Sequence, residues 1–363
     1  MRKKLTITLL LLSTLFTLPI SAVSVSAGSA IVVEASTGRV VFEKDADSRR
    51  PMASTTKIMT ALVALEAGDT AREVSVSGEA VGVEGSSVYL KTGDQLTLDD
   101  LVWALMLESA NDAAAAIAIE VAGSVEGFAE LMNAKAAELG LSDTHFTNPH
   151  GLDDQEHYTT ARDLAKLAVK ALQNERFREI VSTYKHSIRV GDETRYLLNH
   201  NKMLKLYDGA IGVKTGYTKR SGRCLVSAAE RDGVTLVAVT LDAPDDWNDH
   251  RAMLDCGFGA LEARELIGDG DSTFILPCIG CEKNDVMVKN SGGLTVCVPK
   301  DTPEATWRVE LPHYMWAPVS EGQIVGRIVF EANGVELGEV PIVSCETVER
   351  IVYKQGILER LFG

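Results

Sequence analysis

The stretch Ala53-Ser54-Thr55-Thr56-Lys57-Ile58-Met59-Thr60 decides the fold, because it places a hydroxyl and an amine at the start of a strongly patterned helix. Apolar side chains recur at helical spacing along residues 58–65 and Gly68 ends the pattern, which predicts a helix over residues 54–66. Ser54 and Lys57 are three residues apart, so both project from one face of that helix. The unpaired N–H groups of its first turn favour negative charge.

Two later motifs complete a chemical set with Ser54-Thr55-Thr56-Lys57. They are Ser109-Ala110-Asn111 and Lys214-Thr215-Gly216. The order S-x-x-K, S-D-N, K-T-G is typical of penicillin-binding proteins and class A β-lactamases. The middle motif departs from this pattern by one residue, since Ala110 stands where Asp is usual.

Each motif alone is weak, because the chain holds a second copy of two of them. Ser182-Thr183-Tyr184-Lys185 is another S-x-x-K, but no helical pattern follows it, and we expect surface residues near a strand. Lys91-Thr92-Gly93 is another K-T-G, but it precedes Asp94 and a helix start, which indicates a turn. The copy at residues 214–216 lies just before strands, where an extended peptide can pair with a sheet edge.

The roles of the set follow from what acyl transfer needs. Ser54 is the predicted nucleophile, and it requires a base to remove its proton. No G-x-S-x-G elbow or Ser-His-Asp pattern is evident, so Lys57 is the predicted base. Burial beside a second cation, Lys214, disfavours the charged form of Lys57.

The remaining residues are assigned to the substrate. Lys214 attracts a substrate carboxylate, the Thr215 hydroxyl donates a hydrogen bond to it, and Gly216 completes the substrate-binding strand. Ser109 passes a proton toward the leaving amine, and Asn111 holds a substrate amide. The tetrahedral oxyanion needs two backbone N–H donors, which we place at Ser54 and Tyr217.

The first 267 residues predict a leader followed by one α/β (α+β) unit. Strands, several helices and then strands follow one another over residues 28–267, which indicates a sheet with segregated helices. The expected strands are 29–33, 39–43, 224–229 and 234–242, and the expected helices are 54–66, 98–107, 113–121, 128–139, 161–172 and 253–266. Residues 268–345 hold short β-branched runs between Gly, Pro and Asn, which predicts a small all-β C-terminal domain.

Both ends of the chain carry targeting signals. Residues 1–27 hold a cationic start, an apolar run shorter than the ~20 residues that span a bilayer, and small residues before Gly28, which predicts a cleaved signal peptide. Residues 346–363 place apolar side chains along one helical stripe, which fits either an amphipathic tail on a membrane surface or an ordinary packing helix. The net charge of −15 argues against a nucleic-acid partner.

Four of the six cysteines fall in the C-terminal third, where one or two disulfides suit an exported chain. Cys278 and Cys281 form a C-x-x-C, which also raises a metal or redox site. A second C-x-x-C and a His pair at finger spacing are missing from the sequence, so a metal ion is weakly supported. No metal or organic cofactor is expected.

With these motifs the chain resembles the D-alanyl-D-alanine carboxypeptidases, the low-molecular-mass penicillin-binding proteins of serine peptidase family S11. The resemblance covers nearly all of residues 28–345 and includes three further stretches, Asn148-Pro149-His150-Gly151-Leu152, Thr160-Ala161-Arg162-Asp163 and Gly212-Val213-Lys214-Thr215-Gly216-Tyr217-Thr218. It implies a penicillin-recognising serine fold, a β-rich C-terminal domain and a tail on the outer face of the cytoplasmic membrane. It implies peptidoglycan stem peptides ending in D-Ala-D-Ala as substrates, and penicillins as covalent inhibitors of the same serine.

The chain departs from better-known members of this family at two points. Tyr217 stands where His is frequent, which leaves the backbone role intact. An arginine that helps to hold the substrate carboxylate in some members has no clear counterpart in residues 246–251, and Arg251 is left out of the site. Asn148 and His150 are interpreted as a tight loop rather than as catalytic groups.

Three other functions use related chemistry or the same fold. A class A β-lactamase needs a deacylating glutamate, and the surroundings of Glu156 do not match that family's loop. A D,D-endopeptidase acting on cross-linked peptidoglycan uses the same residues. A catalytically silent cell-wall-binding protein has no need of the intact set Ser54, Lys57, Ser109, Asn111 and Lys214.

Overall fold

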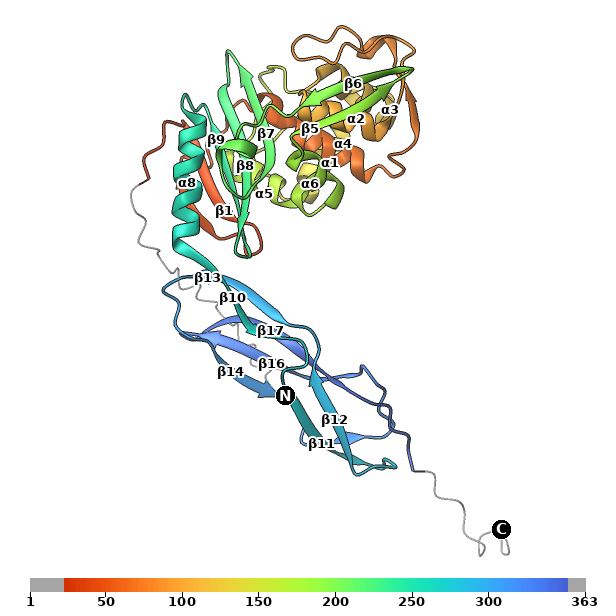
Figure 1. Ribbon diagram of the computed structural model, residues 1–363, viewed down its shortest axis with the longest axis vertical. Helices are drawn as coiled ribbons and strands as arrows, with labels where there is room; N and C mark the ends of the chain where they lie inside the picture. The colour runs from red at the N-terminus through yellow and green to blue at the C-terminus, as the bar shows by residue number, and fades with distance from the viewer. Residues whose placement is uncertain (1–22, 352–363) are drawn as a thin grey trace, which may run out of the picture. The chain divides into compact units, whose positions relative to one another are not determined.

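A five-stranded antiparallel sheet frames the first part of the chain (Figure 1). The computed structural model describes residues 23–351 and divides into two units, the first up to Ala260 and the second from Leu261. The strand order is β2-β1-β9-β8-β7, so β7 lies at an edge. The strands are β1 Ser29–Glu34, β2 Val40–Lys44, β7 Ala210–Thr218, β8 Gly222–Arg231 and β9 Val234–Leu241.

Helices cover both faces of this sheet. The side chains of β9 therefore point alternately into one helical layer and the other, and both sets are buried. Val237, Val239 and Leu241 belong to the main core, which the helices on one face share. Leu236 points the other way and lies against Gly257 of α8 (Asp246–Ala260). The helices of the main layer are α1 Lys57–Glu66, α2 Leu98–Leu107, α3 Asn111–Ala122, α4 Val125–Glu138, α5 Ala161–Leu172 and α6 Glu175–Ser182.

Short elements join these layers. They are the 3₁₀ turns η1 Ala53–Thr56 and η2 Gly78–Ala80, the helix α7 Met203–Leu206, and the two hairpins β3 Glu73–Ser75 with β4 Gln95–Thr97 and β5 Lys185–Val190 with β6 Glu193–Leu198.

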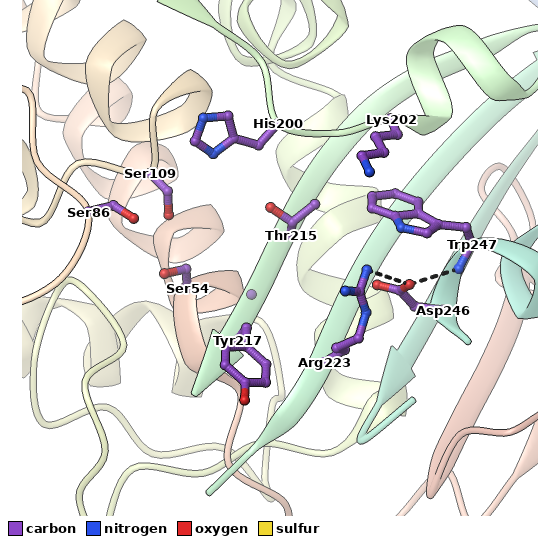
Figure 2. A pocket seen from close by; sticks show the side chains of 11 residues that line it. Ser54, Ser86, Ser109, His200, Lys202, Thr215, Tyr217, Arg223, Asp246 and Trp247 are labelled. Carbon is purple, nitrogen blue, oxygen red and sulfur yellow. Dashed lines mark hydrogen bonds and ion pairs between the residues drawn. The ribbon is translucent and has the colours of Figure 1, made fainter. Parts of the chain in front are cut away.

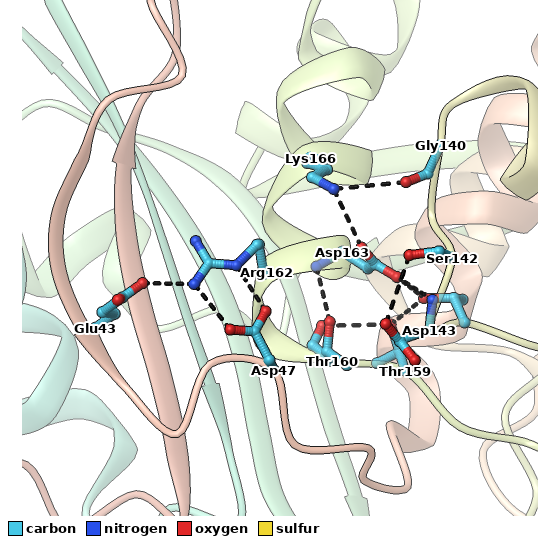
Figure 3. Close-up of polar contacts among 11 residues, drawn as sticks. Glu43, Asp47, Gly140, Ser142, Asp143, Thr159, Thr160, Arg162, Asp163 and Lys166 are labelled. Carbon is cyan, nitrogen blue, oxygen red and sulfur yellow. Dashed lines mark hydrogen bonds and ion pairs between the residues drawn. The ribbon is translucent and has the colours of Figure 1, made fainter. Parts of the chain in front are cut away.

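Polar contacts fix the start of α5 against the loop that follows β2 (Figure 3). The Thr160 hydroxyl accepts a hydrogen bond from the Asp163 N–H at 3.0 Å, which caps the helix. Arg162 donates to both carboxylate oxygens of Asp47 and to Glu43. Residues 160–163 therefore stabilise the fold through these contacts.

The second unit is built of strands. A six-stranded sheet has the order β14-β16-β17-β12-β11-β15, and β10 pairs with β13 separately. Its strands are β10 Leu261–Ile267, β11 Thr273–Ile279, β12 Asp285–Asn290, β13 Leu294–Pro299, β14 Thr306–Glu310, β15 Met315–Trp316, β16 Ile324–Ala332 and β17 Val335–Ser344. A disulfide joins Cys278 to Cys281.

The expected closing helix over residues 253–266 is wrong in its second half. Helix α8 ends at Ala260, and Leu261–Ile267 is a strand paired with β13. Residues 261–266 include good helix formers, but pairing with a distant strand outweighs that local preference. The second unit accordingly begins before the expected boundary at Gly268.

The predicted ends of the chain lie only partly within the described residues. Residues 1–22 of the leader and 352–363 of the tail lie outside them. Of the tail, Val348 and Arg350 form isolated bridges with Val319 and Cys281, so this part is extended and not helical. Among residues 23–351, no helix has the length and apolar character needed to cross a membrane.

Candidate active site

Ser54 lies on the 3₁₀ turn η1, directly before α1. A loop supports this turn closely: a Cβ on Gly151 would lie 2.0 Å from the Ala53 carbonyl oxygen. His157 supports it from the side, because its Nδ1 accepts a hydrogen bond from the Thr147 N–H, which leaves Nε2–H to donate to the Thr56 hydroxyl at 2.8 Å. Burial lowers the pKa of His157 to about 4, so this histidine is neutral and structural.

Lys57 begins α1 and its ammonium nitrogen is enclosed. Its Nζ lies 3.0 Å from Ser54 Oγ, 2.7 Å from Asn111 Oδ1 and 2.5 Å from the His150 carbonyl oxygen. The side chain is fully buried. The pKa of Lys57 is lowered well below its usual value, first by burial and then by the nearby charge of Lys214, with Asp112 opposing the shift.

Ser109 and Asn111 lie where α2 ends and α3 begins. Ser109 has φ +59°, a left-handed conformation that turns the chain sharply between the two helices. The Asn111 N–H donates to Ser86 O at 2.7 Å, and its side-chain amide donates to Glu84 O. Gly85 permits this approach, since a Cβ there would lie 2.7 Å from Asn111 Nδ2.

The third motif lies within the edge strand β7, rather than before the strands. Lys214 is 2% exposed, and burial lowers its pKa to about 7, with Glu108 opposing. Gly216 faces the nucleophile turn: a Cβ there would lie 3.0 Å from the Ser54 backbone nitrogen. Tyr217 is 67% exposed at the rim, so its side chain is free of the buried chemistry.

Five of the predicted site residues line one cavity of about 380 Å³ (Figure 2). They are Ser54, Ser109, Thr215, Gly216 and Tyr217, while Lys57 and Asn111 lie beneath Ser54. Within residues 23–351, no three His, Cys, Asp or Glu residues form a cluster that could hold a metal ion.

The cavity also contains residues that sequence analysis missed. Arg223 on β8 stands opposite Tyr217 in the strand register and enters the cavity from the neighbouring strand. Its Nη2 donates to Asp246 Oδ1 at 2.8 Å, and its guanidinium lies 5.8 Å from the centre of the Trp247 ring. His200 and Lys202 line the opposite end. No local motif marks these residues; only the cross-strand register could have indicated Arg223.

The alternative copies of the motifs lie outside this cavity. Ser182 ends α6 and Lys185 begins β5, both exposed, and Lys91-Thr92-Gly93 forms a turn before β4. The predicted loop at residues 148–151 is confirmed, because Asn148 Oδ1 accepts hydrogen bonds from the N–H groups of His150 and Gly151. Burial lowers the pKa of His150 to about 3, and only its carbonyl contacts Lys57.

Comparisons with known proteins agree with this geometry. The family model described as D-alanyl-D-alanine carboxypeptidase matches residues 17–245, and the model described as penicillin-binding protein 5, C-terminal domain, matches residues 262–350. The chain belongs to the D-alanyl-D-alanine carboxypeptidase family. It is therefore a serine carboxypeptidase of the penicillin-binding protein type.

Individual relatives of this family resemble the chain over most of its length. The carboxypeptidase DacF of Bacillus subtilis is 31% identical, over 89% of this chain and 86% of its own. DacC of Escherichia coli is 32% identical, over 91% and 86%. The structure of penicillin binding protein 5 from Haemophilus influenzae superposes with a TM-score of 0.69 at 26% identity, over 90% of this chain and 98% of that one. The α/β unit with a β-rich C-terminal domain is thus confirmed.

Proposed function

We propose that this chain is an exported D,D-carboxypeptidase that removes the terminal D-alanine from peptidoglycan stem pentapeptides through an acyl-enzyme on Ser54. The observation that carries the proposal is the contact between Lys57 Nζ and Ser54 Oγ at 3.0 Å, deep in a site where the lysine is fully buried. No other described amine or imidazole contacts Ser54, so Lys57 is the base that the geometry favours.

A neutral Lys57 suits its three neighbours. A neutral amine offers two N–H donors and one lone pair. The Asn111 and His150 carbonyl oxygens accept the two donors, which leaves the lone pair for the Ser54 hydroxyl proton. Lys57 takes that proton while Ser54 Oγ bonds to the carbonyl carbon of the penultimate D-alanine.

The backbone N–H groups of Ser54 and Tyr217 are the donors for the developing oxyanion in this proposal, and the close packing of Gly216 on the nucleophile turn supports it. The C–N bond then breaks, and Ser109 relays a proton from Lys57 to the leaving D-alanine. Water attacks the ester, the acyl peptide leaves with a new carboxyl group, and the Ser54 hydroxyl is restored.

The substrate carboxylate is held by a cationic end of the cavity. Lys214 and the Thr215 hydroxyl are the predicted partners, and we add Arg223, which stands opposite Tyr217 in the strand register and lines the same cavity as Thr215. Asp246 is 3% exposed and positions the Arg223 guanidinium through its 2.8 Å hydrogen bond. Penicillins carry a carboxylate and an acylating carbonyl, so we expect them to acylate Ser54 in the same site.

Export and membrane attachment are parts of this proposal that rest on the sequence. The N-terminal leader directs the chain across the cytoplasmic membrane. The C-terminal tail contacts the outer face of the cytoplasmic membrane.

The test is D-alanine release from a pentapeptide that ends in D-Ala-D-Ala, with wild-type protein and Ser54→Ala. The matched control is Ser182→Ala, because Ser182 belongs to the second S-x-x-K. We expect release by wild type and the control, and none by Ser54→Ala. Labelling by a fluorescent penicillin should follow the same pattern. Release of D-alanine by Ser54→Ala, or no release by the wild type, overturns the proposal.

A further inference from the structure

A second cavity, of about 360 Å³, adjoins the active site and is formed by residues 87–89, Glu108 and residues 195–197. Ser86 lines the catalytic cavity, and its chain neighbour Ser87 lines the second one. Ser109 and its neighbour Glu108 are divided in the same way. The two cavities therefore border the same two stretches of backbone, which Figure 2 shows at Ser86 and Ser109, on the side of Ser54 away from Arg223. We call the second cavity the side pocket.

Two exposed tyrosines line the side pocket. Tyr89 is 81% exposed and Tyr196 on β6 is 85% exposed, more than any other aromatic side chain within residues 23–351. They come from separate elements, a loop after η2 and the β5–β6 hairpin, and yet they border one space. Rings so exposed bury little apolar area on folding, so their faces remain available to a ligand.

The backbone presents Tyr89 in a strained conformation. Tyr89 has φ +58°, a left-handed value that is unfavourable for an aromatic residue and that is concentrated at functional sites. Its N–H donates to the Ser87 hydroxyl at 2.8 Å, and that hydroxyl donates to the buried Asp112 carboxylate at 2.6 Å. Asp112 also accepts a hydrogen bond from the Leu90 N–H at 3.0 Å. The residues on both sides of Tyr89 are thus fixed, and the ring is placed before a ligand arrives.

Arg195 joins the two walls that carry the tyrosines. It directly precedes Tyr196 on β6, its Nη1 donates to the Val88 carbonyl oxygen, and its Nη2 lies 3.8 Å from Asp94 Oδ2. The side pocket therefore combines two aromatic faces with the guanidinium of Arg195 and the carboxylate of Glu108.

A sugar ring matches this combination of groups. The face of a tyrosine ring carries partial negative charge, which attracts the C–H groups on the face of a sugar. The hydroxyl and acetamido groups at the edge of an N-acetylated sugar can bond to the tyrosine hydroxyls, to a guanidinium or to a carboxylate.

The side pocket also lies where a sugar attached to the substrate would fall. Asn111, the predicted partner of a substrate amide, contacts Glu84 O and Ser86 O, so residues 84–86 border the bound stem and lead along the chain to Tyr89. Three residues precede D-Ala-D-Ala in a stem pentapeptide, and they span at most about 11 Å. In peptidoglycan the amino end of the stem is joined to a sugar, which this length places just outside the catalytic cavity.

We propose that the side pocket is a saccharide site, in which Tyr89 and Tyr196 bind an N-acetylated sugar of the glycan strand that bears the stem being cleaved. The proposal rests on the carboxypeptidase function above and leaves the chemistry at Ser54 unchanged. The enzyme then prefers stems that are attached to glycan over free peptides of the same sequence.

Two substrates with one peptide test the proposal. The first is the free pentapeptide that ends in D-Ala-D-Ala, and the second carries N-acetylglucosaminyl-N-acetylmuramic acid at its amino end. The variants are Tyr89→Asn, because asparagine tolerates a left-handed backbone, and Tyr196→Thr, because threonine suits a strand. The matched control is Trp307→Thr, since Trp307 is an aromatic residue that is 63% exposed on strand β14 of the second unit.

We expect wild type to hydrolyse the disaccharide substrate with a kcat/KM about tenfold above that for the free pentapeptide, through a lower KM. Each tyrosine variant should lower kcat/KM for the disaccharide substrate about three- to tenfold, and that for the free pentapeptide less than twofold. Trp307→Thr should change neither. Chitotetraose, an N-acetylglucosamine oligomer without a peptide, should inhibit hydrolysis of the disaccharide substrate only in proteins that keep both tyrosines.

Activity on the free pentapeptide shows that each variant is folded. Equal kcat/KM values of wild type for the two substrates, or equal effects of the tyrosine variants on both, overturn the saccharide site alone. A preference for the disaccharide substrate that survives in both variants overturns it as well, because the sugar then binds elsewhere. Hydrolysis of neither substrate by wild type overturns the carboxypeptidase function and the saccharide site with it.

Discussion

Arg223 Nη2 donates to Asp246 Oδ1 at 2.8 Å, and this pair joins strand β8 to the first turn of helix α8 at the wall of the active site. Asp246 is buried, while the Arg223 side chain is 43% exposed and lines the cavity. Burial raises the pKa of Asp246 above its usual value, and the hydrogen bond and charge of Arg223 oppose this shift. Asp246 therefore positions the Arg223 side chain, and the Arg223 guanidinium remains available to a ligand.

Replacement of Arg223 by Ala should raise KM for a substrate with a free terminal carboxylate by about 10- to 100-fold, because a charged hydrogen bond is lost. A substrate whose terminus is amidated should be affected little. Arg251→Ala is the control, since Arg251 is exposed on the same helix α8. Steady-state kinetics on both substrates measure this effect. An equal rise in KM for the free and the amidated substrate would contradict a role of Arg223 in carboxylate binding.

Replacement of Lys57 by Arg should lower kcat by about 10²- to 10⁴-fold, because a guanidinium does not give up its proton at neutral pH. Lys185→Arg provides the control in the second S-x-x-K and should retain full activity. The rate of labelling by a fluorescent penicillin should fall in parallel with D-alanine release. An active Lys57→Arg enzyme would show that another group removes the Ser54 proton.

The pH dependence of kcat/KM should be bell-shaped. Lys57 must be neutral to act as a base, so activity falls as pH decreases through its lowered pKa. Lys214 must be charged to hold a carboxylate, so activity also falls as pH rises through its pKa of about 7 in the free enzyme. A bound carboxylate favours the protonated Lys214, so the alkaline limb of kcat should lie at higher pH than that of kcat/KM.

An amidated substrate supplies the control for this profile. Without a carboxylate to hold, the charge of Lys214 loses its importance for binding, and the alkaline limb should disappear. The acid limb should remain, since Lys57 acts on either substrate. A rate that is constant from pH 5 to 9 would argue against a lysine base.

Replacement of Gly151 by Ala should destabilise the protein by about 2–4 kcal/mol and reduce D-alanine release, because the new Cβ collides with the Ala53 carbonyl next to Ser54. Gly151 has φ +88°, and Gly140 has φ +65° with open space around its Cβ position. Gly140→Ala therefore isolates the backbone cost, about 1 kcal/mol, from the collision. Urea unfolding of both variants separates the backbone cost from the cost of the collision. Equal losses of unfolding free energy in the two variants would mean that the loop at Gly151 adapts to the new Cβ.

Local patterns predicted which residues lie together at the candidate site, because each motif is fixed to one local element. One turn of helix brings Ser54 to Lys57, and the junction of two helices carries Ser109 and Asn111. Arg223 escaped prediction because it reaches the cavity only through its pairing opposite Tyr217, which depends on the register of two strands. Strand β10, which begins at Leu261, was not predicted for the same reason, since its partner β13 is distant in the sequence.

The last prediction concerns the start of the mature chain. Asp249 is 5% exposed, and its carboxylate accepts hydrogen bonds from Ser26 N at 2.9 Å, Ser26 Oγ at 2.7 Å and Ala27 N at 3.2 Å. Cleavage at the expected point before Gly28 would remove all three donors and leave a buried carboxylate without them. That loss costs about 1–3 kcal/mol, so we expect a mature N-terminus upstream of Ser26.

Mass spectrometry of the exported protein measures this end directly, and a start at Gly28 would contradict the expectation. Thermal unfolding of chains that begin at Val23 and at Gly28 measures the energy of the contact. The shorter chain should unfold at a temperature lower by several degrees, since about 1 kcal/mol corresponds to about 2–4 °C in a domain of this size. Asp249→Ala should reduce that difference, because Ser26 and Ala27 of the longer chain then lose their shared acceptor.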